Sequence, residues 1–98
     1  MTDSVYTLRY RRFREILIEA RKARKLSQEA LANRLGRIQT FVSKYERGER
    51  RLDVVEFLEV ARALEIDAYK VLVTVHGIIG FLAGSKEGRR SASAGRRR

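Results

Sequence analysis

The chain has 98 residues and a mass of 11.3 kDa, which fits one small domain with a tail and excludes an enzyme of two catalytic lobes. Lys and Arg number 22 against 12 Asp and Glu, so the formal charge of +10 indicates an acidic partner, nucleic acid first and an anionic membrane second. The chain has no cysteine and a single histidine, His76, which excludes thiolate and histidine metal clusters. We therefore expect neither a metal nor another cofactor.

The first helix is predicted from Arg9 to Lys25. Its apolar residues recur at spacings of three and four, which places them on one face of a helix, with arginine, lysine and glutamate elsewhere. These apolar positions are Phe13, Ile16, Leu17, Ala20 and Ala23.

Two short helices are predicted next. Ser27 is placed to cap the second helix, which ends at Gly36, because glycine adopts the left-handed conformation that turns a chain out of a helix. The third helix runs from about Ile38 to Arg47 and ends at Gly48. The expected inward residues are Ala30, Leu31 and Leu35 in the second helix and Ile38, Val42 and Tyr45 in the third.

A capping box formed by Asp53 and Glu56 begins the fourth helix. Asp67 begins a fifth, shorter helix that continues through Lys70 and Leu72. The apolar run over residues 71–82 is compatible with a strand or with a helix, and short apolar runs do not decide between the two. The buried stripe expected on the fourth helix is Val54, Phe57, Leu58, Ala61 and Leu64. The pattern predicts an all-α domain of five helices, because no hairpin signal is present.

Charge divides the chain into three parts. Residues 9–51 carry a net +9, residues 52–84 carry −3 and residues 85–98 carry +5. The last segment has no uncharged residue larger than alanine, so we expect a flexible basic tail over 85–98 after a domain over 1–84. The tail acts either as an electrostatic arm on phosphates or merely as a solubilising extension.

The turn at Gly36 joins two short helices inside the most basic part of the chain, which is the geometry of a helix-turn-helix. The outward residues of the third helix are polar or basic, as entry into a major groove about 12 Å wide requires. They are Gln39, Thr40, Ser43, Lys44 and Arg47.

The sequence here resembles a known family. Leu26-Ser-Gln-Glu-Ala-Leu-Ala-Asn-Arg-Leu-Gly36 followed by Gln39-Thr-Phe-Val-Ser-Lys-Tyr-Glu-Arg-Gly48 is similar to the Cro and phage-repressor type of helix-turn-helix, also called the XRE family. The resemblance covers roughly Phe13 to Leu72. It implies a phage-repressor-like fold that binds double-stranded DNA.

The resemblance also implies roles for single residues. Gln28 matches a glutamine that holds a phosphate and braces the recognition helix, and Gln39 matches the first base-contacting glutamine, which pairs with adenine. The remaining implied positions are Thr40, Ser43 and Lys44 in the groove, and Arg37, Arg47 and Arg50 on the phosphate backbone.

Arg21 and Glu46 match a structural pair of the family, in which an arginine on the first helix meets a glutamate at the end of the third. Phe41 departs from the family pattern, because its position is often small or polar. We expect Phe41 to be partly buried rather than to contact a thymine methyl or a sugar, and we expect Tyr45 in the core.

These features predict a transcriptional regulator, most simply a repressor that binds a palindromic operator as a homodimer through the apolar segment Val71–Leu82. That segment can instead cover the domain's own core. The alternative function is an antitoxin that binds a toxin through its C-terminal region, and a restriction-system controller also fits the size. We expect no enzymatic activity, because no carboxylate cluster, phosphate loop or nucleophile–base pair is present. Without a signal peptide or an apolar run of about 20 residues, we expect no membrane association and a cytoplasmic, nucleoid-associated protein.

Overall fold

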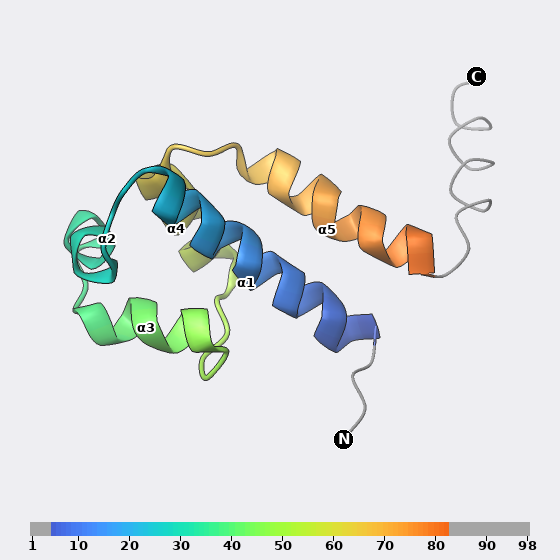
Figure 1. The fold of residues 1–98 in the computed structure, drawn as a ribbon, viewed down its shortest axis with the longest axis horizontal. Helices are drawn as coiled ribbons and strands as arrows, with labels where there is room; N and C mark the ends of the chain where they lie inside the picture. Colours follow the sequence, from blue (N-terminus) through green and yellow to red (C-terminus); the bar gives the residue numbers. More distant parts are fainter. Residues whose placement is uncertain (1–4, 83–98) are drawn as a thin grey trace.

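The computed structural model describes residues 5–82 of the chain. Within this range it is all-α, and five helices follow one another: α1 (Val5–Ala23), α2 (Gln28–Leu35), α3 (Gln39–Arg47), α4 (Val54–Leu64) and α5 (Ala68–Leu82) (Figure 1). This confirms the predicted fold class. The tail predicted over 85–98 lies outside the described residues.

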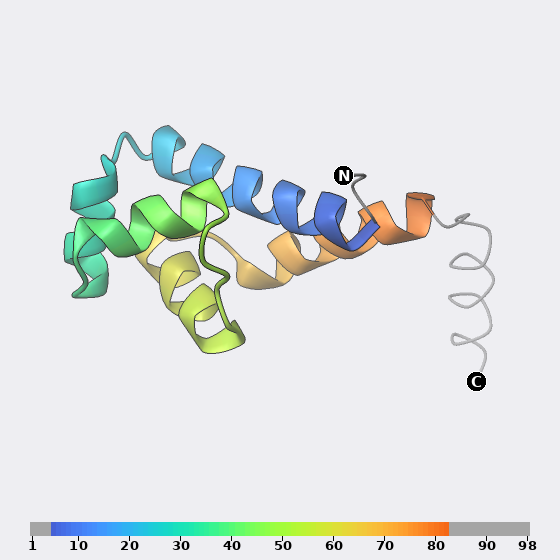
Figure 2. The same ribbon diagram turned by 90° about the horizontal axis from the view of Figure 1, so that it is seen from below.

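Two helices are longer than predicted. Helix α1 begins at Val5 instead of Arg9, and α5 is one continuous helix that includes the β-branched run 71–75. Helix α5 runs alongside α1 (Figures 1 and 2), and Val71 is buried while Val75, one turn further, packs partly buried on the core. Burial at a spacing of four favours helix over the weak intrinsic preference of valine for strands.

The predicted caps at Ser27, Gly36, Gly48 and Asp53 are confirmed, whereas α1 ends at Ala23 and not at the predicted Lys25. The Ser27 hydroxyl accepts a hydrogen bond from the Ala30 amide at 3.0 Å, and the carboxylate of Asp53 and that of Glu56 complete the capping box of α4. Gly36 and Gly48 end α2 and α3 with φ of 69° and 83°. A Cβ at Gly48 would lie 3.1 Å from Arg14 Cζ, a tight contact that adds to the conformational preference for glycine at this positive φ.

The core lies where α1, α2, α3 and α4 meet, with Val71 added from α5. Four residues predicted to face inward are instead exposed: Ala23, Ile38, Val54 and Leu58. Each of the first three lies at a helix end, where the stripe no longer faces the core: Ala23 is the last residue of α1, Ile38 is the N-cap of α3 and Val54 is the first residue of α4. The core residues among the described side chains are Leu17, Leu31, Ala32, Phe41, Val42, Tyr45, Phe57, Val60, Ala61, Leu64 and Val71.

None of the helices within residues 5–82 combines the length and the apolar character that crossing a bilayer requires.

Candidate nucleic-acid interface

Helix α3 is buried on one face and open on the other. Figure 2 views the molecule from below and brings α3 to the front, with α2 at its left end. Its buried side chains are Phe41, Val42, Tyr45 and Glu46. The opposite face carries the predicted groove residues, of which Gln39, Thr40, Lys44 and Arg47 are exposed and Ser43 is half-buried.

A buried ion pair fixes α3 to α1. Arg21 Nε lies 2.7 Å from Glu46 Oε2 and Arg21 Nη2 lies 3.0 Å from Glu46 Oε1, which is a bidentate arrangement. Both residues are less than a tenth exposed. Arg21 Nη1 also donates to the Leu26 carbonyl at 2.8 Å, and Arg14 Nη1 donates to the Glu46 carbonyl at 2.7 Å. The charges are therefore satisfied on several sides, as a buried pair requires.

Hydrogen bonds extend from this ion pair to the surface. Gln28 Nε2 donates to Glu46 Oε1 at 2.9 Å, and Gln39 Nε2 donates to Gln28 Oε1 at 3.3 Å. Gln28 is the first residue of α2 and Gln39 is the first residue of α3. Two glutamines on neighbouring helix starts are thus positioned by a carboxylate that lies in the core.

A second carboxylate holds the two arginines that flank α3. Arg50 Nη1 and Nη2 donate to Glu56 at 2.9 and 2.7 Å, and Arg37 Nη2 lies 3.7 Å from the same carboxylate. Both guanidinium groups lie over the Phe41 ring, with Cζ 4.3 Å (Arg37) and 4.9 Å (Arg50) from its centroid. These hydrogen bonds from Arg50, followed by that from the Asp53 amide, lower the pKa of Glu56 from 4.5 to about 2.

Phe41 is buried to a greater extent than predicted, since only 9 % of it is exposed. Its ring packs edge to face on Tyr45 at a centroid distance of 5.6 Å and is covered on the outside by the two guanidinium groups. The ring therefore contributes to the core and supports the arginines.

Arg47 is paired at the surface. It donates to Glu49 from Nε at 2.9 Å and from Nη2 at 3.1 Å, and these hydrogen bonds lower the pKa of Glu49. Both side chains are more than half exposed, so the pair is weak in water and open to exchange.

The sequence did not predict that Glu49 pairs with Arg47, or that Glu56 pairs with Arg50 and Arg37. A capping box signals Glu56 as a local residue of α4, and nothing in its spacing indicates that it also reaches Arg50 and Arg37. The stacking of both arginines on Phe41 depends on where two loops meet, which no periodicity encodes.

The chain is similar to known proteins in sequence and in fold. Residues 17–71 match the model of a helix-turn-helix family. Among solved structures, an XRE-family like protein from Pseudomonas syringae pv. tomato str. DC3000 is 43% identical, with 76% of this chain and 90% of that chain covered and a TM-score of 0.73. The restriction-modification controller protein C.AhdI from Aeromonas hydrophila is 37% identical, with 63% of this chain and 90% of that chain covered and a TM-score of 0.59. No curated protein matches the chain.

Proposed function

The chain belongs to the helix-turn-helix family, and on that premise we propose that it is a sequence-specific transcriptional regulator that places α3 in the major groove of DNA. One observation carries this proposal. The exposed face of α3 begins with a glutamine amide that is oriented, through Gln28, by the buried Glu46. An oriented amide is suited to pair with adenine N6 and N7, and a disordered one is not.

The proposed base contacts are made by Gln39, Thr40, Ser43 and Lys44. Ser43 Oγ donates to the Thr40 carbonyl at 3.2 Å, so its hydroxyl oxygen remains able to accept a hydrogen bond from a base. Lys44 is exposed and reaches either guanine or a phosphate. No acidic residue lies on this exposed face of α3, which favours approach of the polyanion.

The proposed phosphate contacts come from Gln28, Arg37, Arg47 and Arg50. Among the described residues, the contacts of Arg37 with carboxylates are long, at 3.7 and 4.0 Å, so acidic partners hold it less tightly than they hold Arg47 or Arg50. Arg50 is held by two short hydrogen bonds to Glu56, so its guanidinium is fixed in place and contributes less than Arg37 or Arg47 to the proposed phosphate contacts. Arg47 exchanges Glu49 for a phosphate at small cost, because that pair is exposed.

We propose that the protein acts as a homodimer through α5. Three large apolar side chains of this helix, Tyr69, Leu72 and Val73, are 74, 50 and 49% exposed, so they are not used to pack α5 against α1. Leu72 and Val73 lie within the interface segment Val71–Leu82 predicted from the sequence, and Tyr69 lies just before it. The side chains of this segment from 78 onward are not described. A second exposed apolar group on α4, Val54, Val55 and Leu58, is the competing surface. A two-fold dimer brings two α3 helices to a palindromic site.

Repression is the simplest mode for such a dimer, because a protein bound over a promoter excludes polymerase. The likeness to C.AhdI favours one second candidate, a controller protein of a restriction-modification system. The antitoxin alternative stays a prediction. A DNA-binding role agrees with the expected cytoplasmic, nucleoid-associated location.

Selection of bound sites from random double-stranded DNA tests the proposal. We expect an enriched motif with two inverted half-sites whose centres lie about one helical turn, roughly 10 bp, apart. Enrichment of no motif would contradict sequence-specific binding, and an asymmetric single motif would contradict the homodimer.

A further inference from the structure

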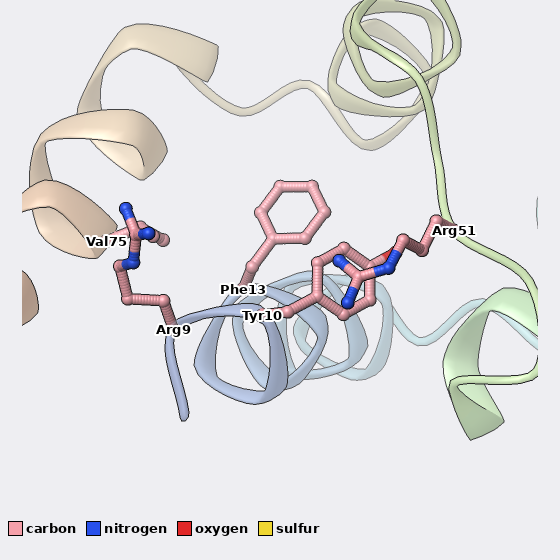
Figure 3. Close-up of a pocket in the computed structure, with 5 residues that line it drawn as sticks. All are labelled: Arg9, Tyr10, Phe13, Arg51 and Val75. Carbon is pink, nitrogen blue, oxygen red and sulfur yellow. The ribbon is translucent and has the colours of Figure 1, made fainter. Parts of the chain in front are cut away.

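A hollow of about 280 Å³ opens between α1, α5 and the segment that joins α3 to α4. Its described lining is Arg9, Tyr10, Phe13, Arg51 and Val75. Figure 3 shows the Tyr10 and Phe13 rings between the two arginines, with Arg9 on the side of Val75 and Arg51 across Tyr10. Cations thus lie on both sides of an aromatic surface.

The aromatic surface of this hollow is held by the core. The rings of Tyr10 and Phe13 lie 5.4 Å apart between centroids, and Phe13 packs edge to face on Phe57 at 5.0 Å. Phe57 is only 4% exposed. The Leu52 amide donates to the Tyr10 hydroxyl at 3.1 Å, which fixes the loop against α1. The hollow is therefore preformed and needs little rearrangement to bind a ligand.

Arg51 differs from its neighbours in its partners. Arg47 and Arg50 each form hydrogen bonds with a carboxylate, whereas no acidic side chain of the described residues pairs with Arg51. Arg51 is an exposed residue, and its Cζ lies 4.3 Å from the centroid of the Tyr10 ring. A guanidinium placed over a ring keeps its N–H edge free for a planar anion, and carboxylate fits that edge with two parallel hydrogen bonds.

We infer that this hollow is a binding site for a small aromatic carboxylate. The carboxylate would pair with Arg51, and the ligand's ring would lie on Tyr10 and Phe13 against Val75. The volume lies just below the range of about 300–1,000 Å³ for ligand pockets, so the hollow accepts one ring and not a fused polycycle. A bare phosphate fits poorly, because the aromatic surface would desolvate it without supplying hydrogen bonds. The inference is independent of DNA binding.

Titration of the isotope-labelled full-length protein with phenylacetate, followed by backbone amide NMR shifts, tests this site. We expect saturable shifts at Leu52, Tyr10 and Val75, with a dissociation constant on the order of 1 mM for so small a ligand. Phenylacetamide, which lacks the charge, and 2-phenylethylammonium, which reverses it, should bind about tenfold more weakly or worse.

The variant Arg51→Gln should also weaken phenylacetate binding about tenfold, because it removes the charged hydrogen bonds. The matched control is Arg62→Gln on α4, which changes an exposed arginine that does not line this hollow and should leave binding unchanged. Equal binding of the three compounds, equal binding to wild type and Arg51→Gln, or shifts that follow protein concentration instead of ligand would each overturn the inference. The last result would assign the hollow to an interface between chains.

Discussion

Gln28 Nε2 donates a hydrogen bond to Glu46 Oε1 over 2.9 Å, and this contact joins the surface of the recognition unit to its core. The same carboxylate binds the Arg21 guanidinium, so one buried acid fixes the angle between α1 and α3 and orients an amide at the start of α2. The structural role of Glu46 therefore meets the proposed DNA-contacting role of Gln28 at one hydrogen bond. A change at Glu46 should alter both.

The buried ion pair should be costly to break from one side. We expect Glu46→Gln to lower the free energy of unfolding by about 3–5 kcal/mol, because it leaves Arg21 buried without its counter-charge. The double variant Arg21→Met with Glu46→Leu should lose much less, since no unpaired charge remains. Urea unfolding followed by circular dichroism measures both. If the single variant loses less than about 1 kcal/mol of unfolding free energy, the Arg21–Glu46 pair contributes no more than an ion pair at the surface.

Glu56 should make stability depend on pH. Its pKa is lowered from 4.5 to about 2 in the folded protein, so its stabilising effect is complete above the unfolded value and declines as pH falls from about 5 to about 2. The difference in stability between wild type and Glu56→Gln should shrink over that window. Thermal unfolding at several pH values measures it, with Glu59→Gln, an exposed neighbour, as the control. A difference that stays constant to pH 2 would contradict the hydrogen bonds from Arg50.

The Tyr45 hydroxyl is an unsatisfied polar group. It is buried with no hydrogen-bond partner among the described residues, and burial, with a further contribution from Glu46, raises its pKa above the ordinary value. We expect Tyr45→Phe to raise stability by about 1 kcal/mol, a rise in Tm of roughly 4–8 °C for a domain of this size. Tyr69→Phe, which changes a tyrosine that is 74% exposed, should leave Tm unchanged. A lower Tm for Tyr45→Phe would show that the hydroxyl has a partner.

The proposed dimer surface can be located by introducing one charged residue on each candidate face. Leu72→Glu on α5 should convert the dimer to a monomer in sedimentation equilibrium, because it buries an unpaired carboxylate in the proposed interface. Val55→Glu on α4 is the matched control and should remain a dimer. The opposite result would move the interface to α4.

The sequence predicted the positions of helices and caps well, because Ser27, Gly36, Gly48 and Asp53 act locally. It did not predict the continuity of α5, since a run of valines fits strand or helix until burial against α1 decides. The sequence also did not predict the contacts between loops that are distant along the chain. The grouping of Arg37, Arg50 and Glu56 around Phe41 arises only from tertiary structure.

In the proposed complex with DNA, α3 contacts bases through Gln39. The most direct test measures the affinity of wild type and of Gln39→Ala for the selected operator and for every single-base variant of one half-site. We predict that replacing one particular adenine lowers the binding free energy of the wild type by about 1–3 kcal/mol. Gln39→Ala should bind the unchanged operator more weakly by a similar amount and should no longer distinguish that base. Its salt dependence should not change, because no charge is lost. If Gln39→Ala binds the operator as wild type does, while Lys44→Ala abolishes discrimination, the assignment of base contacts on α3 is wrong.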